Sequence, residues 1–307
     1  MRVTVTGATG MLGRQVVREL LDRGDEVTVL SRDAGKAERL FDGRAQAKAW
    51  PDPKGEQPPA AALSGRDGVI HLLGEPVAQR WTDDSRHEIR DSRVLATRSL
   101  VSALRELPDD ERPAVLVSQS ASGFYGPRGD EPVAESEPPG DDFLARVCVD
   151  WEAEAREAGA SGVRVALSRT GVVLSDSGGA LEKMLPPFKL GVGGPVAGGR
   201  QYVPWIHTDD VAGGMIFCLD DPGADGPVNL AAPEPVTNAE LSKALGHVLH
   251  RPALAPVPGF AVKLLYGDMA QIVTTGVRAV PNRLRELGYE FRQPRLTAAL
   301  RLATGKR

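Results

Sequence analysis

Three glycines near the start of the chain have the spacing of a loop that binds phosphate groups. Gly7, Gly10 and Gly13 lie in VTVTGATGMLGRQVV, between a predicted strand and a predicted helix. Glycines at these positions allow a tight turn, a close backbone approach to a pyrophosphate, and close packing of helix on strand. The free amides and the positive dipole end of the helix favour an anion. We therefore expect this loop to bind a dinucleotide rather than to form a plain tight turn.

The end of the second predicted strand indicates which dinucleotide binds. A protein that uses NAD usually has an acidic residue there, which accepts a hydrogen bond from the ribose 2′-hydroxyl. This chain has Ser31 and Arg32 in VTVLSRDAGK, and arginine can meet a 2′-phosphate through two parallel hydrogen bonds. We therefore favour NADP over NAD. Asp33 would be the ribose partner under the NAD alternative, in which Arg32 is a solvated loop residue.

The elements that must position these groups alternate along the first half of the chain. Stretches rich in valine, isoleucine and leucine alternate with amphipathic helical patterns, which predicts a parallel sheet covered by helices on both faces. We predict an α/β fold, a Rossmann-type doubly wound parallel sheet with a smaller C-terminal substrate domain. The strands are expected in RVTVTG, EVTVLSR, GVIHLLG, AVLVSQSA and VRVALSRTGVVL.

The pattern changes after residue 174, where a stretch rich in glycine and proline cannot form a regular strand–helix unit. We predict an NADP-binding domain over residues 1–170. A smaller domain over residues 171–307 is expected to cover the crevice at the carboxyl ends of the strands. Within it, residues 203–230 are expected to pack back on the first domain.

The composition excludes several classes of protein. A net charge of −4 over 307 residues gives no electrostatic footprint for nucleic acid or an acidic membrane. No apolar run approaches the roughly 20 residues that span a bilayer, and the chain enters a strand at once, so we expect no signal peptide. Cys148 and Cys218 stand far apart, and the five histidines lack metal-ligand spacing. We expect no metal site, a reducing cytoplasmic location, and a small molecule as the substrate.

Several stretches resemble motifs of the extended short-chain dehydrogenase/reductase superfamily, the group of nucleotide-sugar epimerases and dehydratases. They are TGATGMLG, VIHLLG, VSQSASGFYG and WIHTDDVA. The chain is more similar still to one subgroup of epimerase-like and oxidoreductase-like proteins, through HLLGEPVAQRWT, DFLARVCVDWE and GDMAQIVTTGVRAVPNRLRELGYEF. The last stretch resembles that subgroup's extra C-terminal domain of unassigned function. The resemblance runs from end to end and implies the fold and the cofactor, but no substrate.

The resemblance also shows where this chain departs from the superfamily. There, a tyrosine acts as general acid or base, a lysine one helical turn later lowers its pKa, and a serine at a strand end binds the reacting oxygen. The resemblance places Leu144 at the tyrosine position and Cys148 at the lysine position. Neither can do that chemistry. It implies Ser120 as the catalytic serine, with Ser118 and Ser122 as neighbours. The spacing before the YG pair differs by one residue, which leaves the choice among these serines open.

Other groups could contact a ligand in this fold. Glu75 could bind a ribose or substrate hydroxyl, or be a solvated loop acid. Arg93, where the superfamily often has asparagine, could pair with Glu75, reach the cofactor phosphate, or lie on the surface. Tyr125 is a possible proton donor, but we expect it to be structural. The residues expected to bind the cofactor are Gly7, Thr9, Gly10, Met11, Leu12, Gly13, Ser31, Arg32, Leu72, Leu73, Gly74, Glu75, Arg93, Ser118 and Arg169. Those expected to line the substrate site are Trp81, Gln201 and Trp205.

Two functions follow from these residues. The first is an atypical NADP(H)-dependent oxidoreductase or epimerase-like enzyme that acts on a small polar hydroxyl or carbonyl compound, with Ser120 at the reacting oxygen. The second is a non-catalytic NADP(H)-binding protein that senses redox state or docks a partner. Because the Tyr/Lys pair is absent, we expect no standard sugar-nucleotide epimerase turnover.

Overall fold

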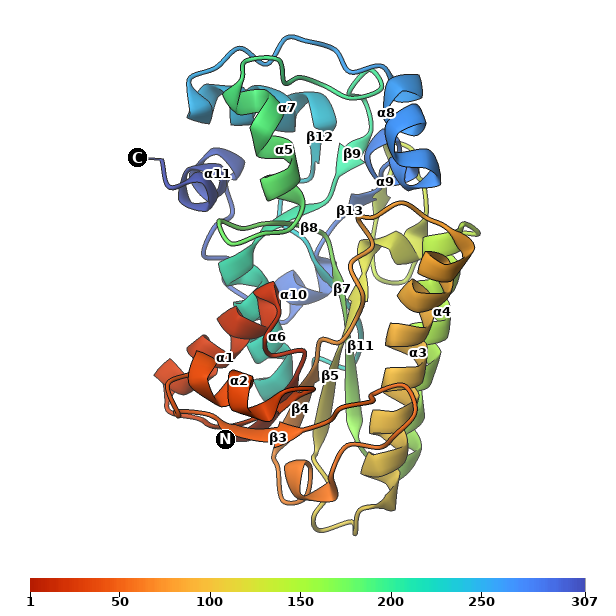
Figure 1. Cartoon of the computed structure of the whole chain (residues 1–307), viewed down its shortest axis with the longest axis vertical. Helices are drawn as coiled ribbons and strands as arrows, with labels where there is room; N and C mark the ends of the chain where they lie inside the picture. The colour runs from red at the N-terminus through yellow and green to blue at the C-terminus, as the bar shows by residue number, and fades with distance from the viewer. Residues whose placement is uncertain (307) are drawn as a thin grey trace.

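The computed structural model describes residues 1–306 and is built around a seven-stranded sheet (Figure 1). All of the neighbouring strands in this sheet run parallel. From one edge to the other, the strands are β11 (Gly226–Leu230), β7 (Arg164–Thr170), β5 (Val115–Ala121), β4 (Gly68–His71), β1 (Arg2–Thr6), β2 (Glu26–Ser31) and β3 (Gln46–Ala49). The predicted doubly wound α/β fold is confirmed.

Helices cover both faces of the sheet (Figure 1). One face is covered by α1 (Met11–Arg23), α2 (Ala34–Leu40) and α6 (Thr208–Asp220). The other is covered by α3 (Asp83–Glu106) and α4 (Phe143–Arg156). Because side chains alternate along a strand, Val117 of β5 packs in the α1/α6 core and its neighbour Leu116 packs in the α3/α4 core. Strands buried on both faces explain the nearly continuous apolar runs in the sequence.

The strand predicted over VRVALSRTGVVL is divided in the structure. β7 ends at Thr170, and β8 (Val172–Leu174) pairs instead with β10 (Trp205–His207), outside the main sheet. The break falls at Gly171, where a Cβ atom would lie 1.9 Å from the carbonyl oxygen of Pro204. Only glycine therefore lets the two backbone segments pass so closely. After β10 the chain forms α6 and then β11, which is the edge strand of the main sheet.

A second group of elements, mostly from the C-terminal part of the chain, lies beyond the carboxyl ends of the strands (Figure 1). Helices α5 (Ala180–Lys189), α7 (Asn238–Leu249) and α11 (Leu296–Thr304) enclose a separate apolar core. The short strands are β6 (Pro132–Val133), β9 (Tyr202–Val203), β12 (Val236–Thr237) and β13 (Arg278–Ala279). The short helices are α8 (Gly259–Tyr266), α9 (Gln271–Thr274) and α10 (Asn282–Glu286), with 3₁₀ turns η1 (Ala60–Ala62), η2 (Ser122–Tyr125), η3 (Glu157–Ser161) and η4 (Gly267–Ala270).

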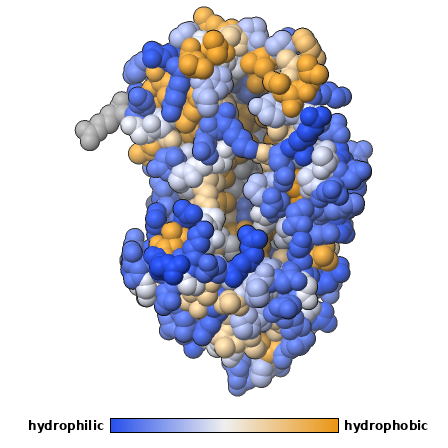
Figure 2. Space-filling view, in the orientation of Figure 1, coloured by the Kyte–Doolittle hydropathy of each residue, from blue (hydrophilic) through white to orange (hydrophobic). Residues whose placement is uncertain are grey.

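The surface is hollowed between this upper group of helices and the helices that flank the sheet (Figure 2). This is the edge at which open parallel sheets bind their ligands. Within residues 1–306, no helix is long and apolar enough to cross a membrane. No group of His, Cys, Asp and Glu side chains over the same residues could hold a metal ion.

Candidate functional site

The glycine loop between β1 and α1 forms a cradle that side chains would fill. Gly7 has a φ of +65°, and a Cβ atom there would lie 2.7 Å from the carbonyl oxygen of Leu72. A Cβ atom on Gly13 would lie 2.3 Å from the carbonyl oxygen of Gly7. Only glycine fits at these two positions, so the loop lies tightly against α1 and against the end of β4.

The first turn of α1 is open to an anion. Gly10 is the residue before the helix and contributes no side-chain cap, and the first turn carries no acidic residue. The amides at a helix start have no partner within the helix, so they can donate to a phosphate. The Met11 side chain contacts the residue before α5, since a Cβ atom on Gly179 would be 3.3 Å from its sulfur. Thr9 contributes its carbonyl oxygen, which accepts from Arg14, and Leu12 packs against the core beneath the loop.

The side chains at the end of β2 distinguish between NADP and NAD as the expected ligand. The Asp33 carboxylate accepts a hydrogen bond from the Lys36 amide at 2.9 Å and so caps α2. The Arg32 side chain is exposed and forms no hydrogen bond or ion pair with any residue from 1 to 306. The Ser31 hydroxyl accepts from the Asp33 amide at 3.2 Å. The free guanidinium, rather than the capping carboxylate, is therefore available to a ligand here.

The loop after β4 holds the guanidinium of Arg93. A Cβ atom on Gly74 would lie 2.9 Å from Cζ of Arg93, so the absence of a side chain at Gly74 makes room for the guanidinium. Its Nη1 donates to the carbonyl of Ile89 at 2.8 Å. The Ser92 hydroxyl accepts from the Glu75 amide at 3.0 Å, and Leu73 packs against the α3/α4 core. The predicted pairing of Arg93 with Glu75 does not form as a hydrogen bond or ion pair.

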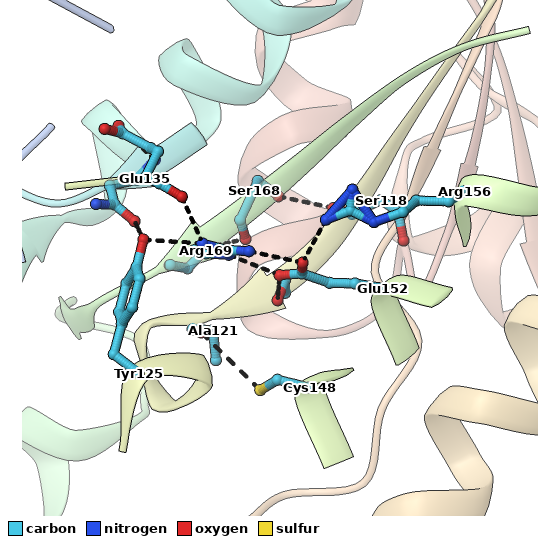
Figure 3. Close-up of polar contacts among 12 residues, drawn as sticks. Ser118, Ala121, Tyr125, Glu135, Cys148, Glu152, Arg156, Ser168 and Arg169 are labelled. Atoms are coloured by element: carbon cyan, nitrogen blue, oxygen red, sulfur yellow. Dashed lines mark hydrogen bonds and ion pairs between the residues drawn. The ribbon is translucent and has the colours of Figure 1, made fainter. Parts of the chain in front are cut away.

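The serine predicted to be catalytic belongs to a buried ionic cluster. Ser120 is fully buried, and its hydroxyl donates to Oε1 of Glu152 at 2.7 Å. The same carboxylate receives Nε and Nη2 of Arg169, each at 2.8 Å (Figure 3). Arg156 adds a fourth donor to this carboxylate at 3.0 Å. A catalytic role for Ser120 would therefore require its bond to Glu152 to be exchanged for one to the substrate.

Arg169, predicted to bind the cofactor, uses its donors inside the protein instead. Besides Glu152, its Nη1 donates to the Tyr125 hydroxyl at 3.1 Å and to the carbonyl of Glu135 at 3.0 Å (Figure 3). Burial alone would lower the pKa of Arg169, but the hydrogen bonds and charge of Glu152 raise it. The sequence showed an arginine at a strand end, but not the acid that binds it.

Tyr125 is a structural residue, as expected. It is fully buried, its hydroxyl donates to Oδ1 of Asn229 at 2.6 Å, and burial raises its pKa to about 12. Asn229 in turn donates to the carbonyl of Val280 at 2.9 Å. This chain of bonds ties η2 and β11 to the C-terminal segment.

Leu144 and Cys148 of α4 occupy the positions of the missing pair. A Cβ atom on Gly123 would lie 3.6 Å from Cβ of Leu144, so Leu144 faces the turn after β5. Cys148 is buried, and its pKa is raised to about 12, chiefly by that burial. Its thiol donates to the carbonyl of Ala121 at 3.9 Å (Figure 3). Neither side chain can exchange a proton with a substrate near neutral pH.

Ser118 and Ser122 flank Ser120 but differ in exposure. The Ser118 hydroxyl is fully buried and has no hydrogen-bond partner among residues 1–306. Ser122 is partly exposed at the start of η2, next to the glycine that faces Leu144. Of the three serines, Ser122 is thus the one that solvent and a ligand can reach without rearrangement.

Two of the three predicted substrate residues have other roles. Trp205 is 1% exposed and packs in the core of α5, α7 and α11, with its indole nitrogen donating to the carbonyl of Glu234. Gln201 donates to the carbonyls of Val196 and Val273, so it fastens two loops together. The indole N–H of Trp205 and the amide N–H of Gln201 are thus used inside the protein, and the assignment of these residues to the substrate site stays a prediction. Trp81 is partly exposed and packs edge-on against Phe143 at 5.1 Å between ring centroids.

The strand order and the glycine cradle are those of Rossmann-type proteins. The chain belongs to the NAD dependent epimerase/dehydratase family, which it matches over residues 3–231. Residues 257–303 match a domain of unknown function, DUF1731. The resemblance to the extended short-chain dehydrogenase/reductase superfamily and to its subgroup with an extra C-terminal domain is confirmed.

Relatives match nearly the whole chain. The chloroplastic homolog of epimerase family protein SDR39U1 from Arabidopsis thaliana is 39% identical over 98% of this chain and 86% of its own length. Epimerase family protein Mb2239 from Mycobacterium bovis is 38% identical over 98% and 97%. The crystal structure of human epimerase family protein SDR39U1 (isoform2) with NADPH is 34% identical, covers 99% of both chains, and superposes with a TM-score of 0.89.

Proposed function

We propose that the protein binds NADP(H) and transfers hydride to or from a small polar carbonyl or hydroxyl compound. The observation that carries the cofactor assignment is the pairing of the glycine cradle with an unpartnered Arg32, while Asp33 is used to cap α2. The human relative of similar structure binds NADPH, which supports the same cofactor here. The nicotinamide, when bound, supplies or accepts the hydride.

The residues of the cradle would hold the cofactor by charge and shape. The amides of the first turn of α1 would donate to the pyrophosphate. Arg32 would donate two parallel hydrogen bonds to the 2′-phosphate, with the Ser31 hydroxyl beside it. Leu72, Leu73 and Gly74, which follow β4, would line the side of the crevice nearest the nicotinamide. Glu75 and Trp81 would contact the substrate.

Proton transfer must use a group other than the usual pair. Leu144 has no proton to give, and the Cys148 thiol, with a pKa of about 12, stays protonated near neutral pH. The proton would therefore come from water or from the substrate. Ser120 is the serine selected by the family resemblance, and Ser122 is the one that is partly exposed. One of these hydroxyls would hold the reacting oxygen.

Deuterium transfer tests this proposal. NADPH that carries deuterium on the reactive face of C4 would be incubated with the protein and a panel of small polar aldehydes and ketones. We expect deuterium in at least one product, detected by mass spectrometry. Separate Ser120→Ala and Ser122→Ala variants identify the hydroxyl at the reacting oxygen, because its loss should abolish transfer and leave NADPH affinity within about twofold. Transfer that persists at full rate in both variants would exclude a serine role.

A second candidate is a non-catalytic NADP(H)-binding protein, a redox sensor or docking protein. It is favoured by the inert character of Leu144 and Cys148. It predicts tight NADPH binding without deuterium transfer across the panel, and no effect of either serine substitution.

A further inference from the structure

Arg93 is a partly buried cation, and only some of its hydrogen-bond donors have partners in the protein. Its guanidinium lies against Gly74 on one side and over the ring of Trp151 on the other, with Cζ 5.2 Å from the ring centroid. Nη1 donates to the carbonyl of Ile89. Nε and Nη2 donate to no group among residues 1–306, and the guanidinium forms no ion pair there.

A partly buried guanidinium destabilises the folded protein unless hydrogen-bond acceptors surround it. Burial lowers the pKa of Arg93, which expresses the cost of removing the charge from water. A guanidinium can donate five hydrogen bonds, and a charged group enclosed without partners is destabilising. The Glu75 carboxylate stands close enough to favour the charged form of Arg93, but it forms no hydrogen bond with the guanidinium. The geometry thus leaves two donors for a ligand oxygen.

The position of Arg93 in the sheet indicates which half of a bound dinucleotide it would contact. Gly74 follows β4, and Trp151 lies on α4, which packs beside β5. The glycine cradle lies one strand away, after β1. A dinucleotide bound across the carboxyl ends of such a sheet places its adenosine half near β2, its pyrophosphate at the loop after β1, and its other half near β4 and β5. Arg93 is therefore on the nicotinamide side of the pyrophosphate.

We propose that Arg93 is the fixed cation of the nicotinamide half of the site, and that its free Nε and Nη2 donate to the hydroxyl oxygens of the nicotinamide ribose. This inference rests on the proposed NADP(H) function. It also gives a reason for the small neutral side chain at Cys148. A second cation at that position would face the Arg93 guanidinium inside the protein and would be repelled by it.

Binding experiments with a fragment of the cofactor can test the role of Arg93 separately from the proposed binding of NADP(H). NADPH contains both halves of the dinucleotide, whereas 2′,5′-ADP contains only the adenosine half with the 2′-phosphate. We would measure the binding of each to the full-length protein and to Arg93→Met and Arg32→Met by isothermal titration calorimetry. Arg93→Met should weaken NADPH binding by about tenfold and change 2′,5′-ADP binding by less than about twofold, since one charge-assisted contact is worth roughly that much. Arg32→Met should weaken both ligands.

Two further variants serve as controls. Gly74→Ala retains the arginine and the charge of the protein but places a Cβ atom against the guanidinium. It should therefore show the same selective loss of NADPH affinity. Arg93→Lys retains a positive charge and should restore part of the affinity. An equal loss for both ligands, or no loss for NADPH in Arg93→Met and Gly74→Ala, would overturn the role of Arg93. Failure of the unmodified protein to bind either ligand would instead overturn the proposed function.

Discussion

The carboxylate of Glu152 lies 2.8 Å from both Nε and Nη2 of Arg169, in the buried layer between α4 and β7 (Figure 3). Both side chains are at most 3% exposed. The same carboxylate fixes the hydroxyl of Ser120. The ion pair therefore joins the end of β7 to the helix that carries Leu144 and Cys148, and the Ser120 hydrogen bond joins the end of β5 to the same helix.

Removal of this carboxylate should destabilise the protein strongly. Glu152→Ala leaves the Arg169 guanidinium buried with its main partner gone, a change that costs about 3–5 kcal/mol. The control is Glu154→Ala on the same helix, which removes a pair with the exposed Arg98 and should cost less than about 1 kcal/mol. Urea unfolding of the two variants measures the difference. A similar loss of unfolding free energy in both variants would show that the buried ion pair stabilises the protein no more than the exposed one.

A methyl group in the glycine loop should affect the ligand more than the fold. Gly10 has a φ of −74°, which alanine adopts readily, and its Cβ atom would lie 3.3 Å from the carbonyl oxygen of Gly7. Gly10→Ala should therefore weaken NADPH binding by about tenfold or more, because the methyl group occupies the approach of the pyrophosphate. The melting temperature should change little. Gly159→Ala, in open space away from the crevice, should leave both quantities unchanged, and NADPH affinity retained in Gly10→Ala would contradict the cradle.

Sequence patterns predicted the sheet and the loop because these depend on local chemistry. Glycines between a strand and a helix, and the period of the apolar residues, need no partner elsewhere in the chain. The absence of a Tyr/Lys pair was likewise visible from the residue types at Leu144 and Cys148.

The contacts between distant segments could not be predicted in this way. The period of α4 places Glu152 one turn after Cys148, but the arginine that binds it lies on a different element. Trp205 was predicted to line the substrate site because it follows a glycine-rich loop, yet its ring packs among three helices of the upper core. An aromatic residue serves both purposes equally well on residue type alone.

The histidine at the end of β4 makes stability depend on pH. His71 is fully buried, with its two ring nitrogens paired to the hydroxyls of Thr6 and Thr97. Burial lowers its pKa from 6.5 to about 3. The unfolded chain therefore binds a proton that the folded protein excludes, and stability is lost as the pH falls from 6.5 toward 3.

At pH 5 this linkage should cost about 2 kcal/mol relative to neutral pH. His71→Asn should be less stable at neutral pH but should lose less of its stability between pH 7 and pH 5. The exposed His87 provides the control, because His87→Asn should retain the pH dependence of the unmodified protein. Thermal unfolding between pH 5 and pH 7 measures this pH dependence of stability. An unchanged pH dependence in His71→Asn would contradict its assignment to His71.

The two thiols should be chemically silent in the folded protein. Cys148 and Cys218 are buried, and burial raises the pKa of each to about 12, so almost no thiolate forms at pH 8. A thiol-specific chromogenic disulfide should react with both cysteines in denaturant and with neither in native buffer. Rapid reaction of Cys148 in the native protein would contradict this prediction and would indicate an accessible, activated thiol.

The central claim is that Arg32 selects NADP(H) at the end of β2, and calorimetric titration with NADPH and with NADH tests it most directly. We expect NADPH to bind at least about tenfold more tightly than NADH, because the 2′-phosphate adds a charge-assisted contact. Arg32→Ala should remove this preference by weakening NADPH binding alone. Equal affinity for the two dinucleotides in the unmodified protein, or a preference that survives Arg32→Ala, would contradict the claim.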